Sequence, residues 1–287
     1  MHTARTVREL RSFREGLPGP VALVPTMGAL HAGHASLVRR ARAACRSLIV
    51  SSFVNPLQFG AGEDLGRYPR TPEDDARLLA DEGVDLLFAP PEAEMYPRPQ
   101  EIVVQPLTLA QHCEGLRRPD HFRGVATVVL KLLNLCRPQQ AYFGEKDAQQ
   151  LAVVRRLVAD LHLDCDIVAC PIVREADGLA LSSRNRYLSP SERAAAPNLH
   201  RALQVIATAL ASGRSDVNAL LADSRARMSP LRCDYLAVVR PDEFIPLDAV
   251  PADSELLAVG AAFAGNTRLI DAVKARTPKR PTEENVR

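Results

Sequence analysis

The sequence predicts an α/β fold in which a doubly wound, Rossmann-like parallel sheet is followed by a smaller C-terminal α+β domain. Between residues 21 and 170, short apolar segments alternate with amphipathic segments of helical spacing. This β-α-β-α order is typical of a parallel sheet that helices cover on both faces. Crossovers between parallel strands are right-handed, which makes the sheet doubly wound. After Pro171 the alternation stops, which indicates a second domain of a different kind.

Each element of the first region has its own local signal. The first apolar run ends at Pro25, and in the segment that follows Leu37, Val38 and Ala41 share one helical face. The expected strands cover residues 21–24, 48–54, 84–88, 141–143 and 165–170. The expected helices cover residues 35–45, 73–82 and 148–161, together with a segment in which Val125, Val128, Val129, Leu132 and Leu133 recur at helical spacing.

The second region contains turn and helix signals that are not interleaved with strands. Asp177-Gly178 is typical of a turn, and Ser189-Pro190 is typical of a helix start. From that start, a helical pattern runs to about residue 210, and a second one covers 217–228. Strand-like segments cover 235–239 and 256–259. We therefore expect domains at 1–172 and 173–276, followed by a disordered, proline-containing basic tail at 277–287.

Composition limits the possible partners and locations. Lys plus Arg total 36 and Asp plus Glu total 34, and this near balance argues against a dedicated nucleic-acid binder. No apolar run is long enough to span a membrane, and the first residues lack the apolar centre of a secretory signal. The six cysteines form no CxxC pair, which favours reduced thiols in a cytoplasmic protein.

The first stretch that can carry chemistry is 25–34, between the first strand and its helix. A helix N-terminus at the carboxyl edge of a sheet favours anions, and Gly28 and Gly33 allow close backbone approach. His31 and His34 are three residues apart, so both can face one phosphate ligand. The same pattern is also compatible with turn glycines and polar helix-start residues, or with a metal-binding histidine pair.

Two later stretches place cationic or hydroxyl side chains at a helix start or in a loop. Lys146 begins a helix, where a positive charge is unfavourable unless it reaches an anion such as phosphate. Ser182, Ser183 and Arg184 offer hydroxyl and guanidinium donors that suit phosphate oxygens. Solvated side chains on an ordinary helix cap and an ordinary loop explain both stretches equally simply.

Three further stretches carry polar side chains with open roles. Gln58 follows the second strand and can bind a small polar substrate. Asp74 and Asp75 stand at a helix start, where they either complement the dipole or hold Mg²⁺. The basic loop 117–124 is either the edge of an anion site or a solvated loop.

Taken together, these stretches resemble the pantothenate synthetase family, the pantoate–β-alanine ligases of the HIGH-motif nucleotidyltransferase superfamily. His31-Ala-Gly-His34 matches the HxGH element of the superfamily, and 181–185 stands where the family has its counterpart of the KMSKS loop. Phe143-Gly-Glu-Lys-Asp147 and Asn55-Pro56-x-Gln58-Phe59 are more particular to the ligases. The resemblance runs from Val24 to Asp271, nearly the whole chain.

The resemblance implies a two-step reaction that uses ATP and Mg²⁺. Pantoate attacks the α-phosphate of ATP to give pantoyl adenylate and pyrophosphate, and β-alanine then displaces AMP to give pantothenate. It also implies that the second domain is a lid that closes over the nucleotide and that the protein is a homodimer. Its small-molecule partners would be pantoate, β-alanine and ATP.

The resemblance further implies roles for individual residues. His31 and His34 would contact the ATP phosphates and stabilise the adenylation transition state. The triphosphate would be held by Lys146, Ser182, Ser183 and Arg184. The nucleotide would also contact the chain near Pro25, Met27, Gly33, Gly144, Asp147 and Val173. Pantoate would lie among Gln58, Gln150, Thr26, Met27, Val128 and Val129. Asp74 and Asp75 fall where the family has acidic residues near Mg²⁺.

Two other functions remain compatible with parts of the sequence. Another HxGH-type nucleotidyltransferase, acting on a phosphorylated acceptor, would keep the two histidines without needing Gln58 and Gln150. A non-catalytic ATP-binding protein would bind nucleotide without turnover. The combination of His31, His34 and Lys146 with Ser182 argues against such a protein, since it has no need for them.

Overall fold

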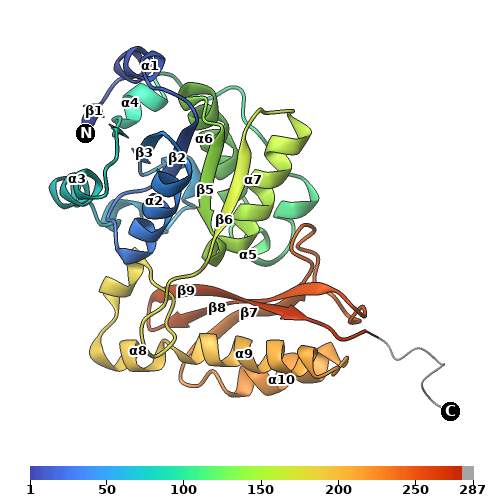
Figure 1. The fold of residues 1–287 in the computed structure, drawn as a ribbon. Coiled ribbons are helices and arrows are strands. Elements are labelled where there is room, and N and C mark those ends of the chain that lie inside the picture. Colours follow the sequence, from blue (N-terminus) through green and yellow to red (C-terminus); the bar gives the residue numbers. More distant parts are fainter. Residues whose placement is uncertain (280–287) are drawn as a thin grey trace. The chain divides into compact units, whose positions relative to one another are not determined.

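The computed structural model describes residues 1–279, which form two compact units, each with its own sheet (Figure 1). The first unit comprises residues 1–145, 150–173 and 181–183, and the second comprises 146–149, 174–180 and the chain from 184 onward. A six-stranded parallel sheet and a separate three-stranded antiparallel sheet confirm the predicted fold class. The domain boundaries expected from the sequence, 1–172 and 173–276, stay a prediction.

The first unit is built on a sheet with strand order β1-β4-β3-β2-β5-β6, in which every pairing is parallel. The strands are β1 (His2–Ala4), β2 (Val21–Thr26), β3 (Ser47–Ser52), β4 (Leu86–Phe88), β5 (Gln140–Gly144) and β6 (Asp166–Cys170). After β2 the chain adds strands on one side, and with β5 it returns to the other side. The switch point of the sheet therefore lies between the carboxyl ends of β2 and β5, where ligands bind in open α/β sheets.

Helices cover both faces of this sheet (Figure 1), because successive strand residues point to opposite sides. Leu23 and Ile49 belong to the core cluster that includes α1, α6 and α7, whereas Val24 and Val50 belong to the cluster that includes α2 and α3. The helices of this region are α1 (Val7–Glu15), α2 (Ala32–Ala44), α3 (Pro72–Asp81), α4 (Glu92–Met95), α5 (Cys113–Arg117), α6 (His121–Cys136) and α7 (Ala148–Asp160). Short 3₁₀ turns lie at η1 (Pro56–Gln58), η2 (Asp64–Arg67), η3 (Thr108–Ala110) and η4 (Glu145–Asp147).

The N-terminal strand β1 and helix α1 were not expected from the sequence. A local signal for α1 does exist, since Thr6 and Glu9 form a capping box that satisfies two backbone N–H groups. Strand β1 has only three residues and pairs with β4, which lies 84 positions along the chain in the His2–Leu86 pair. Such a short strand is stabilised by its sheet partner, so its own sequence gives little indication of it.

The second unit contains a sheet of order β7-β8-β9 whose core is completed by helix α9. Its strands are β7 (Arg232–Val239), β8 (Glu255–Ala264) and β9 (Thr267–Arg276), and its helices are α8 (Pro190–Ala195), α9 (Asn198–Ala211) and α10 (Val217–Ala226), after the turn η5 (Ser183–Tyr187). The helical pattern expected up to residue 210 is interrupted at Pro197, and β9 was not expected. Thr277 is buried and its hydroxyl donates to Pro251 O, so the packed chain includes the first residue of the expected tail. Residues 280–287 of the expected tail lie outside the described residues.

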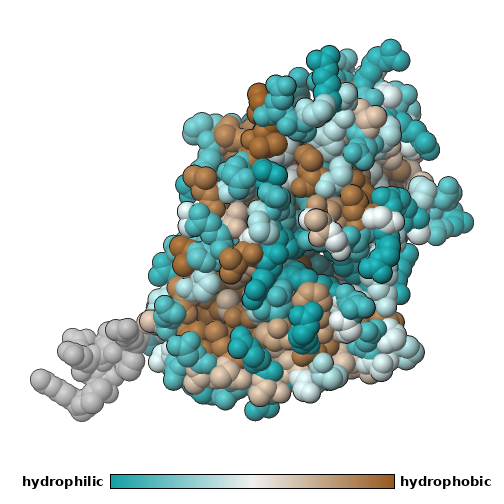
Figure 2. Space-filling model, turned by 180° about the vertical axis from the view of Figure 1, so that it is seen from behind, coloured by the Kyte–Doolittle hydropathy of each residue, from teal (hydrophilic) through white to brown (hydrophobic). Residues whose placement is uncertain are grey.

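The surface is mixed in character. Figure 2 shows hydrophilic and hydrophobic residues interspersed over one face. Within residues 1–279, no helix combines the length and the apolar character that a bilayer crossing requires.

Candidate active site

The site is built on the segment that leaves β2 at the sheet's switch point and enters α2. His31 is the N-cap of α2, and its Nδ1 accepts the backbone N–H of Gly33 at 3.1 Å. The Nδ1 of His34 accepts the backbone N–H of His31 at 3.4 Å, so the two imidazoles form a capping box. Their ring centroids are 4.1 Å apart. The pair is therefore fixed on the first turn of a helix, as the sequence predicts.

These caps determine which ring nitrogen of each histidine can carry the proton. Because each Nδ1 accepts a backbone N–H, the neutral ring carries its proton on Nε2. Gly33 allows the His31 ring to fold back in this way, since a Cβ there would lie 2.8 Å from the Cε1 of His31. Two Nε2–H donors next to a helix N-terminus suit phosphate oxygens.

The turn before His31 is held by residues from distant segments. Gly28 and Ala29 both have left-handed backbone, with φ of 77° and 49°. The N–H groups of Ala29 and Leu30 donate to the two carboxylate oxygens of Asp75, at 2.9 and 2.8 Å. The hydroxyl of Ser183 donates to the carbonyl of Ala29 at 2.9 Å. Residues 181–183, here called the serine loop, belong to the first unit and are thus hydrogen-bonded directly to the turn that presents the histidines.

The two aspartates expected near Mg²⁺ differ in their surroundings. Asp74 is exposed and pairs with Arg77. Asp75 is buried and also accepts the hydroxyl of Thr71 at 3.0 Å. The structure therefore gives these neighbouring carboxylates separate partners, and Asp75 supports backbone amides.

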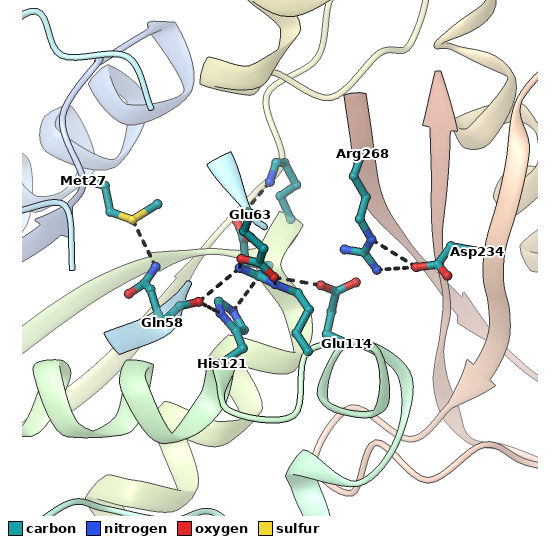
Figure 3. Close-up of polar contacts among 10 residues, drawn as sticks. Met27, Gln58, Glu63, Glu114, His121, Asp234 and Arg268 are labelled. Atoms are coloured by element: carbon teal, nitrogen blue, oxygen red, sulfur yellow. Dashed lines mark hydrogen bonds and ion pairs between the residues drawn. The ribbon is translucent and has the colours of Figure 1, made fainter. Parts of the chain in front are cut away.

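Gln58 is buried and its side chain is held at both ends. Its Oε1 accepts the amide of Asn55 at 3.1 Å. Its Nε2 donates to the sulfur of Met27 at 3.0 Å (Figure 3). Asn55 in turn accepts the hydroxyl of Tyr96 at 2.7 Å and donates to Gly124 O at 3.1 Å. The structure thus brings together Met27 and Gln58, which the resemblance assigns to one substrate.

A second set of contacts fixes the backbone of Gln58. These contacts come from the stretch 117–124, whose role the sequence left open. Arg118 and His121 belong to the stretch 117–124 that was expected to be a basic loop, and His121 is the first residue of α6. Both donate to the Gln58 carbonyl, His121 Nδ1 at 2.9 Å and Arg118 at 3.2 Å. Arg118 also pairs with Glu63 at 2.6 Å. Burial and the neighbouring Arg118 charge lower the pKa of His121 to about 4. Burial alone would raise the pKa of Glu63, but its hydrogen bonds and ion pair with Arg118 hold it below the usual value.

A plain solvated loop does not describe Arg118 and His121, which are half-buried, and the anion-binding edge stays a prediction. In the sequence, the residue that could have indicated this contact with Gln58 is Gly124. A Cβ at this position would lie 2.5 Å from the backbone nitrogen of Gln58. A glycine there allows α6 to approach η1 closely.

The remaining expected residues have varied surroundings. Thr26 donates to Ser51 O at 2.7 Å and accepts the N–H of Gly28 at 3.2 Å, so its hydroxyl shapes the turn. Lys146 lies 3.1 Å from Asp147 within the second unit, which also contains Arg184. Val128 and Val129 are buried in the core on α6. Pro25, Gly144, Gln150, Val173 and Ser182 are all half-buried in the first unit.

The fold and these residues define a class of protein, an α/β enzyme with an HxGH element after a central parallel strand. The model of one family, described as pantoate-beta-alanine ligase, matches residues 1–274. The chain therefore belongs to the pantoate–β-alanine ligase family. This membership confirms the family resemblance, and the ligase class that the family description names agrees with the expected enzyme class.

Individual relatives agree with this assignment. The chain is 54% identical over 257 residues to a bifunctional pantoate ligase/cytidylate kinase from Thermosynechococcus vestitus, covering 88% of this chain and 50% of that protein. It spans about half the length of that relative. A crystal structure of pantothenate synthetase from Thermus thermophilus superposes with a TM-score of 0.88 at 49% identity, covering 95% of this chain and 99% of that one.

A third relative was solved with ligands. It is the pantoate-beta-alanine ligase from Francisella tularensis, described as complexed with beta-gamma ATP and beta-alanine. It has 33% identity and a TM-score of 0.79, and the match covers 95% of this chain and 97% of that one.

Proposed function

We propose that this chain condenses pantoate with β-alanine in two steps through a pantoyl adenylate. In the first step a pantoate carboxylate oxygen attacks the α-phosphorus of ATP, and the bond to the β-phosphate oxygen breaks to release pyrophosphate. In the second step the amine of β-alanine attacks the acyl carbon and loses a proton, and AMP leaves with the acyl–oxygen electron pair. Neither step needs a covalent protein nucleophile, so donors and cations suffice.

The observation that carries the proposal is the orientation of the imidazole pair. Both Nδ1 atoms accept backbone N–H groups, which leaves the proton of each neutral ring on Nε2. We assign His31 and His34 to hydrogen bonds with ATP phosphate oxygens, where negative charge grows during adenylation. Donors that the helix start has already fixed need no reorganisation when that charge develops.

The other site residues are assigned by the chemistry of their side chains. Lys146, Ser182 and Arg184 supply donors for the triphosphate, and Ser183 orders the same loop through Ala29. The nucleotide is assigned contacts near Pro25, Met27, Gly33, Gly144, Asp147 and Val173. Pantoate is assigned to Gln58, Gln150, Thr26 and Met27, with Val128 and Val129 as its apolar wall. The closing of the second unit over the nucleotide stays a prediction.

The residues expected near Mg²⁺ do not fit a site built by the protein. Both oxygens of Asp75 already accept backbone N–H groups, and Asp74 pairs with Arg77. Across residues 1–279 no group of three or more His, Cys, Asp or Glu side chains could hold a metal ion. We propose that Mg²⁺ accompanies ATP through its phosphates, and we derive no step through the two aspartates.

The assembly and location are also proposals. We propose a homodimer in the cytoplasm, without nucleic-acid or membrane partners. The near balance of 36 basic and 34 acidic residues supports the absence of nucleic acid. Among the described residues, Ile102, Leu107 and Leu116 are exposed at 86%, 75% and 63%, which supports an interface with a second copy. Light scattering after size exclusion tests the dimer, since a mass of one chain would refute it.

Mass spectrometry of the reaction products tests the proposed function. The chain is incubated with ATP, Mg²⁺ and pantoate, with and without β-alanine. Pantothenate and AMP should appear together only with β-alanine, and pantoyl adenylate should accumulate without it. ATP that stays intact would refute the proposal and would direct the search to phosphorylated acceptors.

A further inference from the structure

We propose that Asp75 is a positioning residue for the adenylation step, acting through the backbone turn that presents His31 and His34. This inference rests on the proposed function. Asp75 lies on the first turn of α3, 46 residues from Ala29, and only 4% of it is exposed. A carboxylate buried to this degree needs strong hydrogen-bond donors.

Two of the groups that donate to Asp75 belong to the turn. Its Oδ2 accepts the N–H of Ala29 at 2.9 Å, and its Oδ1 accepts the N–H of Leu30 at 2.8 Å. The hydroxyl of Thr71 donates to the same Oδ1 at 3.0 Å. Hydrogen bonds to a charged acceptor are about twice as strong as neutral ones. Asp75 therefore anchors two successive amides directly before the N-cap of α2.

The turn needs such an anchor because of its backbone. Gly28 and Ala29 have φ values of 77° and 49°, and the left-handed region is unfavourable for an alanine because its Cβ approaches the following carbonyl oxygen. Gly28 also packs against the carboxylate, since a Cβ there would lie 3.0 Å from the Oδ2 of Asp75. Without the carboxylate, the amides of Ala29 and Leu30 would both lose their partner, and Ala29 would lose the hydrogen bond that offsets its strain.

Within the first unit, Ala29 connects the turn that precedes His31 to the loop that carries Ser183. The N–H of Ala29 is bound by Asp75, and its carbonyl accepts the hydroxyl of Ser183 at 2.9 Å. A shift of this residue would therefore move the imidazole pair and the serine loop together. We expect a defect in the step that forms the adenylate, with little effect on the later attack by the amine.

The test compares Asp75→Asn with Asp81→Asn, an exposed aspartate on the same helix. Asparagine keeps the shape but directs an NH₂ group at one of the two amides. Pantoate-dependent ATP–pyrophosphate exchange should fall roughly 10- to 100-fold in Asp75→Asn. The KM for pantoate, the half-saturating Mg²⁺ concentration and the aminolysis of supplied pantoyl adenylate should each stay within about threefold. Asp81→Asn should match the wild type.

Two readouts separate positioning from metal binding and from the proposed function itself. Amide hydrogen exchange at Ala29 and Leu30 should speed up by about tenfold or more in Asp75→Asn. Unchanged protection, or recovery of activity in excess Mg²⁺, would overturn the inference. A wild-type chain that makes no pantothenate would refute the proposed function, whereas the exchange at these two amides would still decide whether Asp75 holds the turn.

A milder pair of variants covers the case in which Asp75→Asn does not fold. Thr71→Val removes the hydroxyl that donates to Asp75, and Thr71→Ser retains it. Thr71→Val should lower pyrophosphate exchange several-fold more than Thr71→Ser, by about the loss of one hydrogen bond. Equal rates in the two variants would overturn the inference.

Discussion

Gly124 lies on the first turn of α6, where the helix contacts the backbone of η1. In Gly124→Ala, the added Cβ would lie 2.5 Å from the nitrogen of Gln58 and closer still to the carbonyl group of Leu57. Because real Cβ contacts essentially never fall under 3.0 Å, the helix and η1 must separate by at least about 0.5 Å. Both neighbours are backbone, so no flexible side chain can move aside.

That separation acts on the hydrogen bonds that orient Gln58. Asn55 donates at 3.1 Å both to the carbonyl of Gly124 and to the Oε1 of Gln58. An increase of 0.5 Å or more takes such a bond beyond hydrogen-bond distance. Losing one bond corresponds to about 1–1.5 kcal/mol, or roughly tenfold in affinity. The strain should also lower the free energy of unfolding by about 1–3 kcal/mol.

Steady-state kinetics with each substrate varied in turn measure this effect. The KM for pantoate should rise roughly tenfold in Gly124→Ala, while the KM for ATP stays within about twofold. Gly66→Ala is the matched control, because a Cβ at Gly66 meets nothing within 4 Å. An unchanged KM for pantoate in a folded Gly124→Ala protein would refute this account of how Gln58 is positioned.

Three further predictions follow from the same geometry. His34→Ala should slow pyrophosphate exchange by about 10²–10³, the cost of one preorganised donor, and a wild-type rate would contradict its role. Lys146→Ala should impair adenylation more than the aminolysis of supplied pantoyl adenylate; equal losses would argue against a triphosphate contact. Burial lowers the pKa of His121 from 6.5 to about 4. At pH values between these two, His121 is therefore protonated in the unfolded chain and neutral in the folded one. Stability should therefore fall by up to about 3 kcal/mol as the pH drops through that window. Urea unfolding of His121→Asn, which keeps a donor to Gln58, should show a weaker fall, and parallel curves would contradict the prediction.

Local sequence patterns were sufficient to predict most strands of the parallel sheet and most of the helices between them. The expected strand 165–170 is observed as Asp166–Cys170, and the expected helix 148–161 as Ala148–Asp160. At α2 a cap accounts for the difference, because His31 caps the helix, which therefore begins at Ala32. Strand β9 escaped prediction because its alternation of buried residues stops at Ala272, and because the buried residue before that position is the charged Asp271. Its charge is compensated by Arg174 at 2.7 Å, a partner 97 positions away.

The sequence by itself determined the alternating α/β order, the HxGH element and the family, because periodicity and motif spacing are properties of neighbouring residues. Only the tertiary structure decided which partner each polar side chain takes. Asp75 reads from the sequence as a helix-start carboxylate, yet packing on the sheet brings it to the amides of residues 29 and 30. Arg118 and His121 read as a basic loop, yet the close approach that Gly124 allows directs them to the carbonyl of Gln58. Burial then determines their role, because a polar group removed from water must take whichever donor or acceptor the topology brings within reach.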